Sequence, residues 1–285
     1  MRSGFANVPK GPVRTLAIAI PSRNRPEDVQ RCVASIAGQP TPPDQLIVMD
    51  QSAEKYNLPS LPYLEHIYDT SVKGLPAARN RCIKALRCDA VLFLDDDCEL
   101  LSDCVPAVIE SFNKHTKAIG VQCTIRFPQI TSWKARLLRA VFSHGFFREG
   151  SVKRRNGIQL RTLGGCAMAF RTSLFEREIF DEHLNDYANG EDWEFSKRAQ
   201  SYGTMWKVQD ARVHHHTATV NRYNADRMFQ QRWTNFLYFY NKHNAGSGLA
   251  NRFWLRWWLI GESILALQKG VKPPIFWTAR SDRFH

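Results

Sequence analysis

The pattern of apolar and polar residues changes between a strand period and a helix period over the first two hundred residues. Segments of strand length that are rich in apolar residues occupy positions 16–20, 46–49 and 89–94, and each is followed by polar or acidic residues. Such segments are typical of strands buried on both faces of a parallel sheet. We therefore expect these three segments to form the centre of an α/β domain.

A helix is predicted between the first two segments. Pro26 suits its first turn, and Gly38 is a natural stop. The apolar residues between them recur at helical spacing: Val29, Cys32, Val33 and Ile36. A strand–helix–strand unit of this kind predicts a parallel strand pair with a right-handed crossover.

The same patterns predict most of the remaining elements. They are a short edge strand at 65–68, a helix from 74 to about 87, a strand at 119–125, a helix at 133–142, a helix that starts after Gly190 and ends at Gly203, a short strand at 205–208, and a helical tail. We expect residues 143–157 to form a long loop.

Length and composition fit one large domain with an appendage. The chain has 285 residues, of which 44% are apolar, which argues against disorder. We predict an N-terminal extension over 1–14, an α/β domain over 15–220 with a mostly parallel sheet flanked by helices, and a helical, aromatic and basic region over 221–285. Residues 1–14 lack the apolar core of a signal peptide, and no segment reaches the length of a membrane span.

The formal net charge of +12 predicts an anionic partner, such as a nucleic acid, a nucleotide or an anionic membrane surface. Eight lysines and arginines lie between Lys134 and Arg161 against Glu149 alone, whereas acidic residues gather at 95–99 and 181–194. The tail segment 249–267 carries tryptophans beside arginines, so it either packs on the main domain or lies at a membrane interface. The seven cysteines are odd in number and none has CxxC spacing, which predicts free thiols in a reducing compartment.

Three consecutive carboxylates, Asp95, Asp96 and Asp97, follow the third strand segment. Ligands in open α/β sheets bind beyond the carboxyl ends of the strands. Asp95 and Asp97 would point the same way if the backbone stayed extended, and carboxylate oxygens suit Mg²⁺ or Mn²⁺ holding a diphosphate. The alternative is a solvated acidic turn.

Other polar residues lie where a ligand could reach them. Asp50 ends the second strand, where it either binds a nucleobase or ribose or makes a turn with Ser52. Arg79 either faces a phosphate or carboxylate or forms a surface ion pair. The small residues around Gly165 allow close approach of a backbone to a ligand. Glu191 and Asp192 either serve a site or stabilise the first turn of a helix, and the histidines 214–216 either ligate a metal or lie in a solvated loop.

Taken in order, these segments resemble the family 2 inverting glycosyltransferases, which have the GT-A fold. The matching segments are 19–25 (AIPSRNR), 48–52 (VMDQS), 74–80 (GLPAARN), 93–97 (FLDDD), 164–171 (GGCAMAFR), 180–182 (FDE) and 190–194 (GEDWE). They lie within residues 15–217, and their order and spacing also match the family.

The resemblance implies a site and a reaction. Its nucleotide-sugar-binding residues would be Pro21, Arg23, Asp50, Arg79, Asp95, Asp96, Gly165 and Glu191. Asp192 would be the catalytic base that takes a proton from the acceptor hydroxyl. A Mg²⁺ or Mn²⁺ on Asp97 and one histidine would offset the charge of the leaving diphosphate. His215 fits the histidine position, although His214 and His216 remain alternatives.

The resemblance favours a uridine diphosphate sugar as the donor, with deoxythymidine or guanosine diphosphate sugars as alternatives. The basic segment and the aromatic tail favour a glycan or lipid-linked acceptor, and a cytoplasmic protein that associates with the inner face of the cell membrane. The rival interpretations are a catalytically inactive nucleotide-sugar-binding protein and a nucleic-acid-binding protein, whose phosphates the acidic motifs would repel without a metal. A sugar nucleotidyltransferase would need a glycine-rich phosphate loop near the N-terminus, which is missing.

Overall fold

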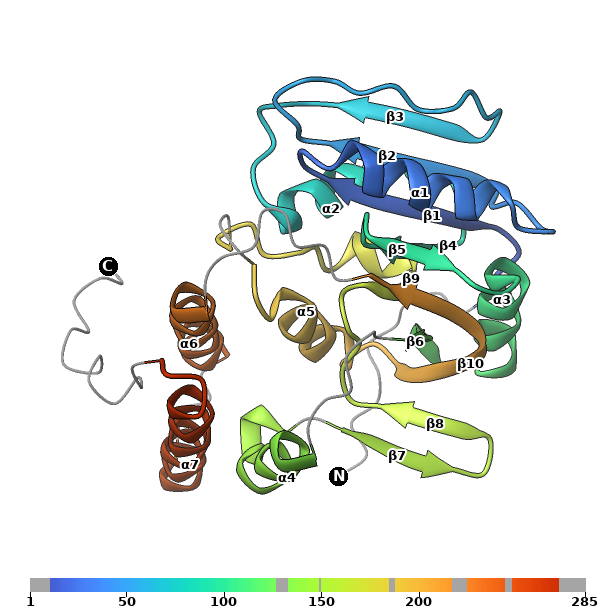
Figure 1. Cartoon of the computed structure of the whole chain (residues 1–285). Coiled ribbons are helices and arrows are strands. Elements are labelled where there is room, and N and C mark those ends of the chain that lie inside the picture. Colours follow the sequence, from blue (N-terminus) through green and yellow to red (C-terminus); the bar gives the residue numbers. More distant parts are fainter. Residues whose placement is uncertain are drawn as a thin grey trace. The chain divides into compact units, whose positions relative to one another are not determined.

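The computed structural model describes residues 11–126, 133–148, 150–184, 188–216, 225–243 and 248–271 (Figure 1). The chain forms two compact units. Unit 1 comprises Met1–Pro128 and Gly150–Val220, and unit 2 comprises Gln129–Glu149 and Asn221–His285. The first ten residues of the predicted N-terminal extension lie outside the described residues, and the predicted domain boundaries stay predictions.

Unit 1 is built on one mixed sheet of ten strands. Their bounds are β1 (Leu16–Ser22), β2 (Gln45–Asp50), β3 (Leu64–Tyr68), β4 (Ala90–Leu94), β5 (Cys98–Leu100), β6 (Ala118–Arg126), β7 (Ser151–Arg154), β8 (Gly157–Leu160), β9 (Ala167–Arg171) and β10 (Thr204–His215). The spatial order is β3-β2-β1-β4-β9-β6-β10-β8-β7, and β5 pairs with β10. Figure 1 shows β3 at one edge and the β7–β8 hairpin at the other.

Most of the sheet runs in one direction. Strands β3, β2, β1 and β4 pair in parallel, and β6 pairs in parallel with β10. Because β9 is antiparallel to both β4 and β6, those two strands also share a direction. The predicted α/β architecture, with a mostly parallel sheet and a β1–helix–β2 crossover, is confirmed, and the predicted edge strand is β3.

Helices cover both faces of this sheet. They are α1 (Pro26–Ala37), α2 (Leu75–Ile83), α3 (Cys104–Lys114) and α5 (Glu191–Ala199). One buried cluster joins α1 and α3 to the sheet, and the other joins α2 and α5 to the opposite face. All seven cysteines are buried and free, as predicted. The carboxyl ends of β1, β2 and β4 therefore open between two layers of helices.

Unit 2 is helical, as the tail pattern predicts. It contains α4 (Trp133–Phe142), a 3₁₀ turn at Gly145–Phe147, α6 (Ala225–Lys242) and α7 (Leu249–Leu267). Its centre is aromatic: the ring of Trp258 stacks on Phe147 at 4.4 Å and on Phe236 at 5.3 Å. Among the described residues, every helix is too short or too polar to cross a membrane.

One local prediction was wrong, and one helix was not predicted. Residues 143–157 were expected to be a loop, but they contain the 3₁₀ turn and β7, which pairs with β8 across the turn at Arg155 and Asn156. The hairpin lies at the sheet edge, and its strands, SVKR and GIQL, are too short and contain too few apolar residues for periodicity to identify them. Helix α3 was missed as well, although its buried residues recur at helical spacing.

Candidate functional site

The three carboxylates after β4 reach different partners because the backbone turns there. The Cys98 N–H donates to the Asp95 carbonyl at 3.1 Å, so the extended conformation does not persist through the triplet. Asp96 is buried and accepts hydrogen bonds from Ser22 Oγ at 2.8 Å and Arg25 Nη1 at 3.0 Å. Burial raises the pKa of Asp96 to about 7 against the opposing effect of Arg25. Asp96 thus ties the triplet to the loop after β1.

Asp97 lies against the end of β10. The imidazole Nε2 of His215 is 3.0 Å from Asp97 Oδ1, and His216 pairs instead with Glu99 at 3.0 Å. His215 is therefore the histidine of the triplet that contacts the carboxylate predicted to bind metal. Burial alone would lower the pKa of His215, but hydrogen bonds to Asp97 and Cys166 raise it to about 10.

The chemistry of these groups fits a divalent cation. Ligand atoms of Asp97, Cys98 and His215 lie within 4.8 Å of one another. Carboxylate oxygen and imidazole nitrogen suit Mn²⁺, and carboxylate oxygen suits Mg²⁺, whereas the thiol of Cys98 is too soft a ligand for either ion. Cys98 Sγ instead approaches the Cys166 carbonyl at 3.5 Å. A cation held by Asp97 and His215 would displace the imidazole proton.

Arg79 is the cation at the centre of a buried network. Its side chain comes from α2 and is fully buried. Its guanidinium pairs with Glu191, lies 3.5 Å from Asp95 Oδ1, and donates to the Gly165 carbonyl at 3.0 Å. The ion pair that Arg79 forms is therefore buried and not on the surface, and its predicted contact with a ligand stays a prediction. Arg79 connects β4, α5 and the loop before β9.

The neighbours Glu191 and Asp192 differ in exposure. Glu191 is buried, and burial together with Asp192 raises its pKa to about 7 despite the opposing charge of Arg79. Asp192 is half-buried at the start of α5, directly after Gly190, whose φ of 90° needs glycine. Asp192 is thus the carboxylate of the pair that a ligand can reach.

The loop before β9 fixes the position of Asp192. Three successive backbone N–H groups donate to three side chains: Leu163 to Ser196 Oγ at 3.0 Å, Gly164 to Gln122 Oε1, and Gly165 to Asp192 Oδ2 at 2.7 Å. A Cβ at Gly165 would lie 3.1 Å from Arg79, 3.3 Å from Glu191 and 3.4 Å from Asp192. Gly165 therefore lets the backbone approach three site residues at once.

Asp50 is the last residue of β2, and its side chain is enclosed by other residues. It is fully buried, Oδ1 accepts from the Ser52 N–H at 2.8 Å, and Oδ2 lies 3.2 Å from His66 Nε2. The ring of Tyr56 stacks on His66 at 5.3 Å. The predicted turn contact with Ser52 therefore forms, and His66 links Asp50 to the ring of Tyr56.

The two predicted residues of the first loop differ in exposure. Pro21 is buried within β1 and pairs with Met49 of β2, whereas Arg23 is exposed just beyond the strand. Asp50 pairs in register with Ser22, the partner of Asp96. These contacts place the ends of β1 and β2 beside the acidic triplet.

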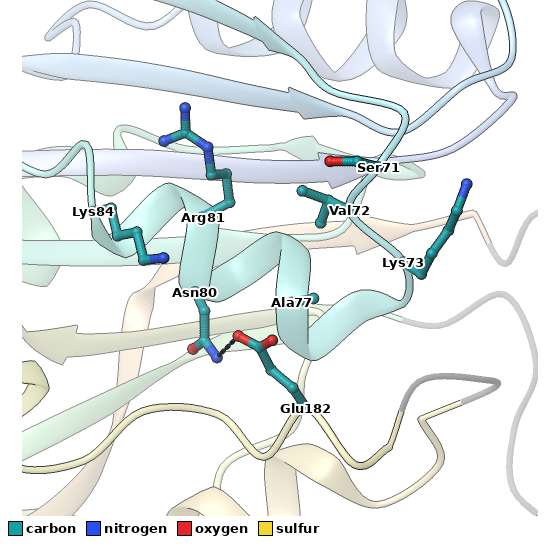
Figure 2. Close-up of a pocket in the computed structure, with 8 residues that line it drawn as sticks. All are labelled: Ser71, Val72, Lys73, Ala77, Asn80, Arg81, Lys84 and Glu182. Carbon is teal, nitrogen blue, oxygen red and sulfur yellow. Dashed lines mark hydrogen bonds between the residues drawn. The ribbon is translucent and has the colours of Figure 1, made fainter.

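A polar pocket of about 350 Å³ lies over α2 (Figure 2). Three of its lining side chains are the cations Lys73, Arg81 and Lys84. In Figure 2, Asn80 points toward Glu182, to which it donates a hydrogen bond at 2.7 Å. Asn80 also exchanges hydrogen bonds with the backbone of Phe180, so it fixes the segment before α5 to α2.

Several residues that shape the site were not predicted. Gln122 interrupts the apolar strand β6, and such a buried amide in a strand was a usable signal, because a buried polar group needs partners. His66 and Ser196 carry no comparable signal. Each is one polar residue in a short element, and only the tertiary structure shows that it faces Asp50 or Leu163.

Comparison with protein families gives a match to the model of Glycosyl transferase family 2 over residues 17–184, which is more than half of the chain. This range contains every predicted site residue before α5 and ends shortly before Glu191. No curated protein matches the chain.

Solved structures share the fold at low sequence identity. GalNAc-T7 with UDP, GalNAc and Mn²⁺ has a TM-score of 0.60 and 15% identity, over 94% of this chain and 56% of that one. Mannosyltransferase PcManGT from Pyrobaculum calidifontis, in complex with GDP-Man and Mn²⁺, has a TM-score of 0.57 and 15% identity, over 98% and 82%. S. aureus TarS has a TM-score of 0.53 and 16% identity, over 76% and 38%. The chain thus matches about two fifths of TarS and just over half of GalNAc-T7, and the predicted GT-A fold is confirmed.

Proposed function

Because this chain belongs to glycosyl transferase family 2, we propose that it is an inverting glycosyltransferase of the hexosyltransferase type. It moves a sugar from a nucleotide-diphosphate sugar to a hydroxyl group of a glycan or lipid-linked acceptor. One observation carries the proposal: the half-buried Asp192 is held beside the buried network of Arg79, Glu191 and Asp95 at the carboxyl end of the sheet.

Asp192 is the proposed base. In an inverting transfer, the acceptor hydroxyl attacks the anomeric carbon while a base takes its proton. The hydrogen bond from the Gly165 N–H orients one carboxylate oxygen, and the other accepts from the Trp193 N–H at 2.8 Å. Each oxygen retains a further lone pair for the acceptor proton. Arg79 does not bind the proton; it holds Glu191 and Asp95 in place around the sugar position.

Asp97 and His215 are the proposed ligands of a Mg²⁺ or Mn²⁺ ion. Such an ion stabilises the negative charge that develops on the leaving diphosphate. The nucleoside would occupy the region of Pro21, Arg23 and Asp50, next to Asp96. Structures with the same fold contain UDP or GDP-Man together with Mn²⁺, which supports a nucleotide-sugar donor. We favour a uridine diphosphate sugar.

The experiment is a pair of measurements on Asp192→Asn. The transfer rate should fall about a thousandfold, the range expected for loss of a general base. Thermal stabilisation by UDP, dTDP or GDP with Mn²⁺ should stay that of the wild type, since the proposed nucleoside position is at Pro21, Arg23 and Asp50. The matched control is Asp210→Asn, an exposed carboxylate in β10, which should change neither.

The two measurements separate the rival functions. Wild-type transfer in Asp192→Asn would refute the assignment of the base. Nucleotide binding without transfer to any acceptor in the wild type would favour an inactive nucleotide-sugar-binding protein. Binding to a random oligonucleotide without any response to nucleotides would favour a nucleic-acid-binding protein.

A further inference from the structure

We infer that helix α7 is the surface by which this protein binds an anionic lipid bilayer, with the helix lying along the membrane plane. The inference names a partner for the proposed transferase, and it rests on that function only in assuming that the membrane supplies the acceptor. Four observations on unit 2 support it: exposed apolar residues, their alignment, the adjacent cations and the net charge.

Exposed apolar side chains concentrate in unit 2. Nine large apolar side chains are exposed among the described residues, and six belong to this unit. The fractions exposed on α7 are 84% for Leu249, 55% for Phe253, 43% for Ile260 and 63% for Leu267. Exposed large apolar residues that cluster in this way are typical of a surface that binds a protein, a membrane or a ligand.

These four residues form one stripe along the helix. Their spacings of four, seven and seven residues place them within an arc of about 40° at 3.6 residues per turn. The opposite face of α7 is buried within unit 2, where Trp258 stacks on Phe147 and Glu262 pairs with Arg232 of α6 at 3.2 Å. The stripe is therefore a second apolar face, in addition to the one that packs α7 into its unit.

Two cations flank the stripe on one side. At 3.6 residues per turn, Arg256 lies about 20° and Arg252 about 60° beyond the edge of the arc, and both are exposed. The long methylenes of arginine lie along an apolar surface while the guanidinium reaches the phosphates of the headgroups. This pairing of exposed apolar residues with adjacent arginines is typical of interfacial helices.

Net charge distinguishes a bilayer from other occupants. Unit 2 has 14 lysines and arginines against 4 aspartates and glutamates, a net charge of +10. A second copy of this surface would bring the same charge, which opposes self-association, and a nucleic acid offers no apolar layer to the stripe. An anionic bilayer has negatively charged headgroups for the arginines and an apolar interior for the exposed apolar side chains. Arg252, Arg256 and Glu262 lie within α7, which is too polar to span the membrane.

The experiment is co-sedimentation of the full chain with extruded liposomes. We expect binding to phosphatidylcholine vesicles that contain a quarter phosphatidylglycerol, weak binding to pure phosphatidylcholine, and partial release by 0.5 M NaCl. Phe253→Ser with Ile260→Ser should lower the partition constant at least tenfold, because both side chains would enter the interface. Arg252→Gln with Arg256→Gln should lower it about fivefold per charge on the anionic vesicles alone.

Matched variants control for exposure and folding. Leu101→Ser with Ile179→Ser changes two exposed apolar residues of unit 1, 46% and 53% exposed, and should leave binding unchanged. Asp192→Asn, which removes the proposed base, should bind vesicles like the wild type, so failure of the transferase proposal and failure of this one are distinguishable. Tryptophan fluorescence confirms that each variant is folded.

Three results would overturn the inference. The first is equal vesicle binding by the stripe variant and the wild type. The second is an equal loss in the unit 1 control. The third is a change from dimer to monomer in the stripe variant on size-exclusion chromatography without a change in vesicle binding, which would identify a second copy as the occupant.

Discussion

The two units differ in net charge and in whether their charged side chains are paired within the protein. Unit 1 has 25 basic and 23 acidic residues, a net charge of +2, whereas unit 2 has a net charge of +10 from less than a third of the chain. In unit 1 the carboxylates of the site are balanced by partners: Arg79 faces Glu191 and Asp95, and Arg25 faces Asp96. In unit 2, Arg252 and Arg256 are exposed beside an apolar stripe.

The difference shows how burial changes the use of a charge. A buried carboxylate needs an opposite charge nearby, so the network around Arg79 holds its carboxylates in place and resists disruption. An exposed arginine is screened by water and contributes little to folding, so it remains available to an anionic surface. Substitutions in the network of unit 1 should therefore change stability and the transfer rate, whereas substitutions of the exposed arginines in unit 2 should change vesicle binding.

The largest effect is expected for Arg79→Met. The variant leaves Glu191 and Asp95 without their buried cation, and the free energy of unfolding should fall by about 3–5 kcal/mol. Urea denaturation measures this change. The matched control is Arg81→Met on the same helix, which is half-buried and makes no ion pair with the residues that the structure describes. It should cost about 0.5 kcal/mol or less, and equal effects would show that the network is not a stabilising unit.

A smaller effect is expected for Gly261→Ala in unit 2. The new Cβ would lie 2.4 Å from Phe142 Cβ and 2.5 Å from its Cγ, so α4 would have to shift against α7. Overpacking of this kind costs about 1–3 kcal/mol. Tryptophan fluorescence during denaturation reports it, because six of the eight tryptophans belong to unit 2. Ala250→Ser, at an exposed position of α7, is the control.

The same variant tests whether the units are independent. Stabilisation by nucleotide with Mn²⁺ should persist in Gly261→Ala, because the proposed donor site lies in unit 1. Loss of nucleotide binding would show that a change within unit 2 affects the proposed donor site in unit 1.

The smallest effect on stability is expected for Gly165→Ala. The added methyl would contact Arg79, Glu191 and Asp192 at 3.1–3.4 Å. The transfer rate should fall about tenfold through displacement of Asp192, with a change in the free energy of unfolding below about 1 kcal/mol. Gly164→Ala, whose methyl would meet only Gln122 at 3.7 Å, should retain the wild-type rate. Equal rates in the two variants would show that the Gly165 contact does not position Asp192.

Much of the fold was predictable from local pattern. The strands β1, β2 and β4 and the helices α1, α4 and α5 match their predicted segments. Burial on both faces makes the three strands continuous apolar runs, and burial of one face gives α1 a helical period. The prediction failed for the β7–β8 hairpin, where a polar strand pair at the sheet edge is stabilised by backbone hydrogen bonds. It also failed for β9, whose central, antiparallel place between β4 and β6 depends on both neighbours.

The sequence by itself determined the class of the domain, the order of its elements and the residue types that could carry chemistry, because these depend on local period and composition. Only the tertiary structure decided which of those residues meet. Arg79 pairs with Glu191 across 112 positions of chain, and the Asp97 carboxylate contacts the imidazole of His215, whereas the imidazole of His216 pairs with Glu99. Such contacts depend on the register and direction of strands far apart in sequence, and no local pattern encodes those.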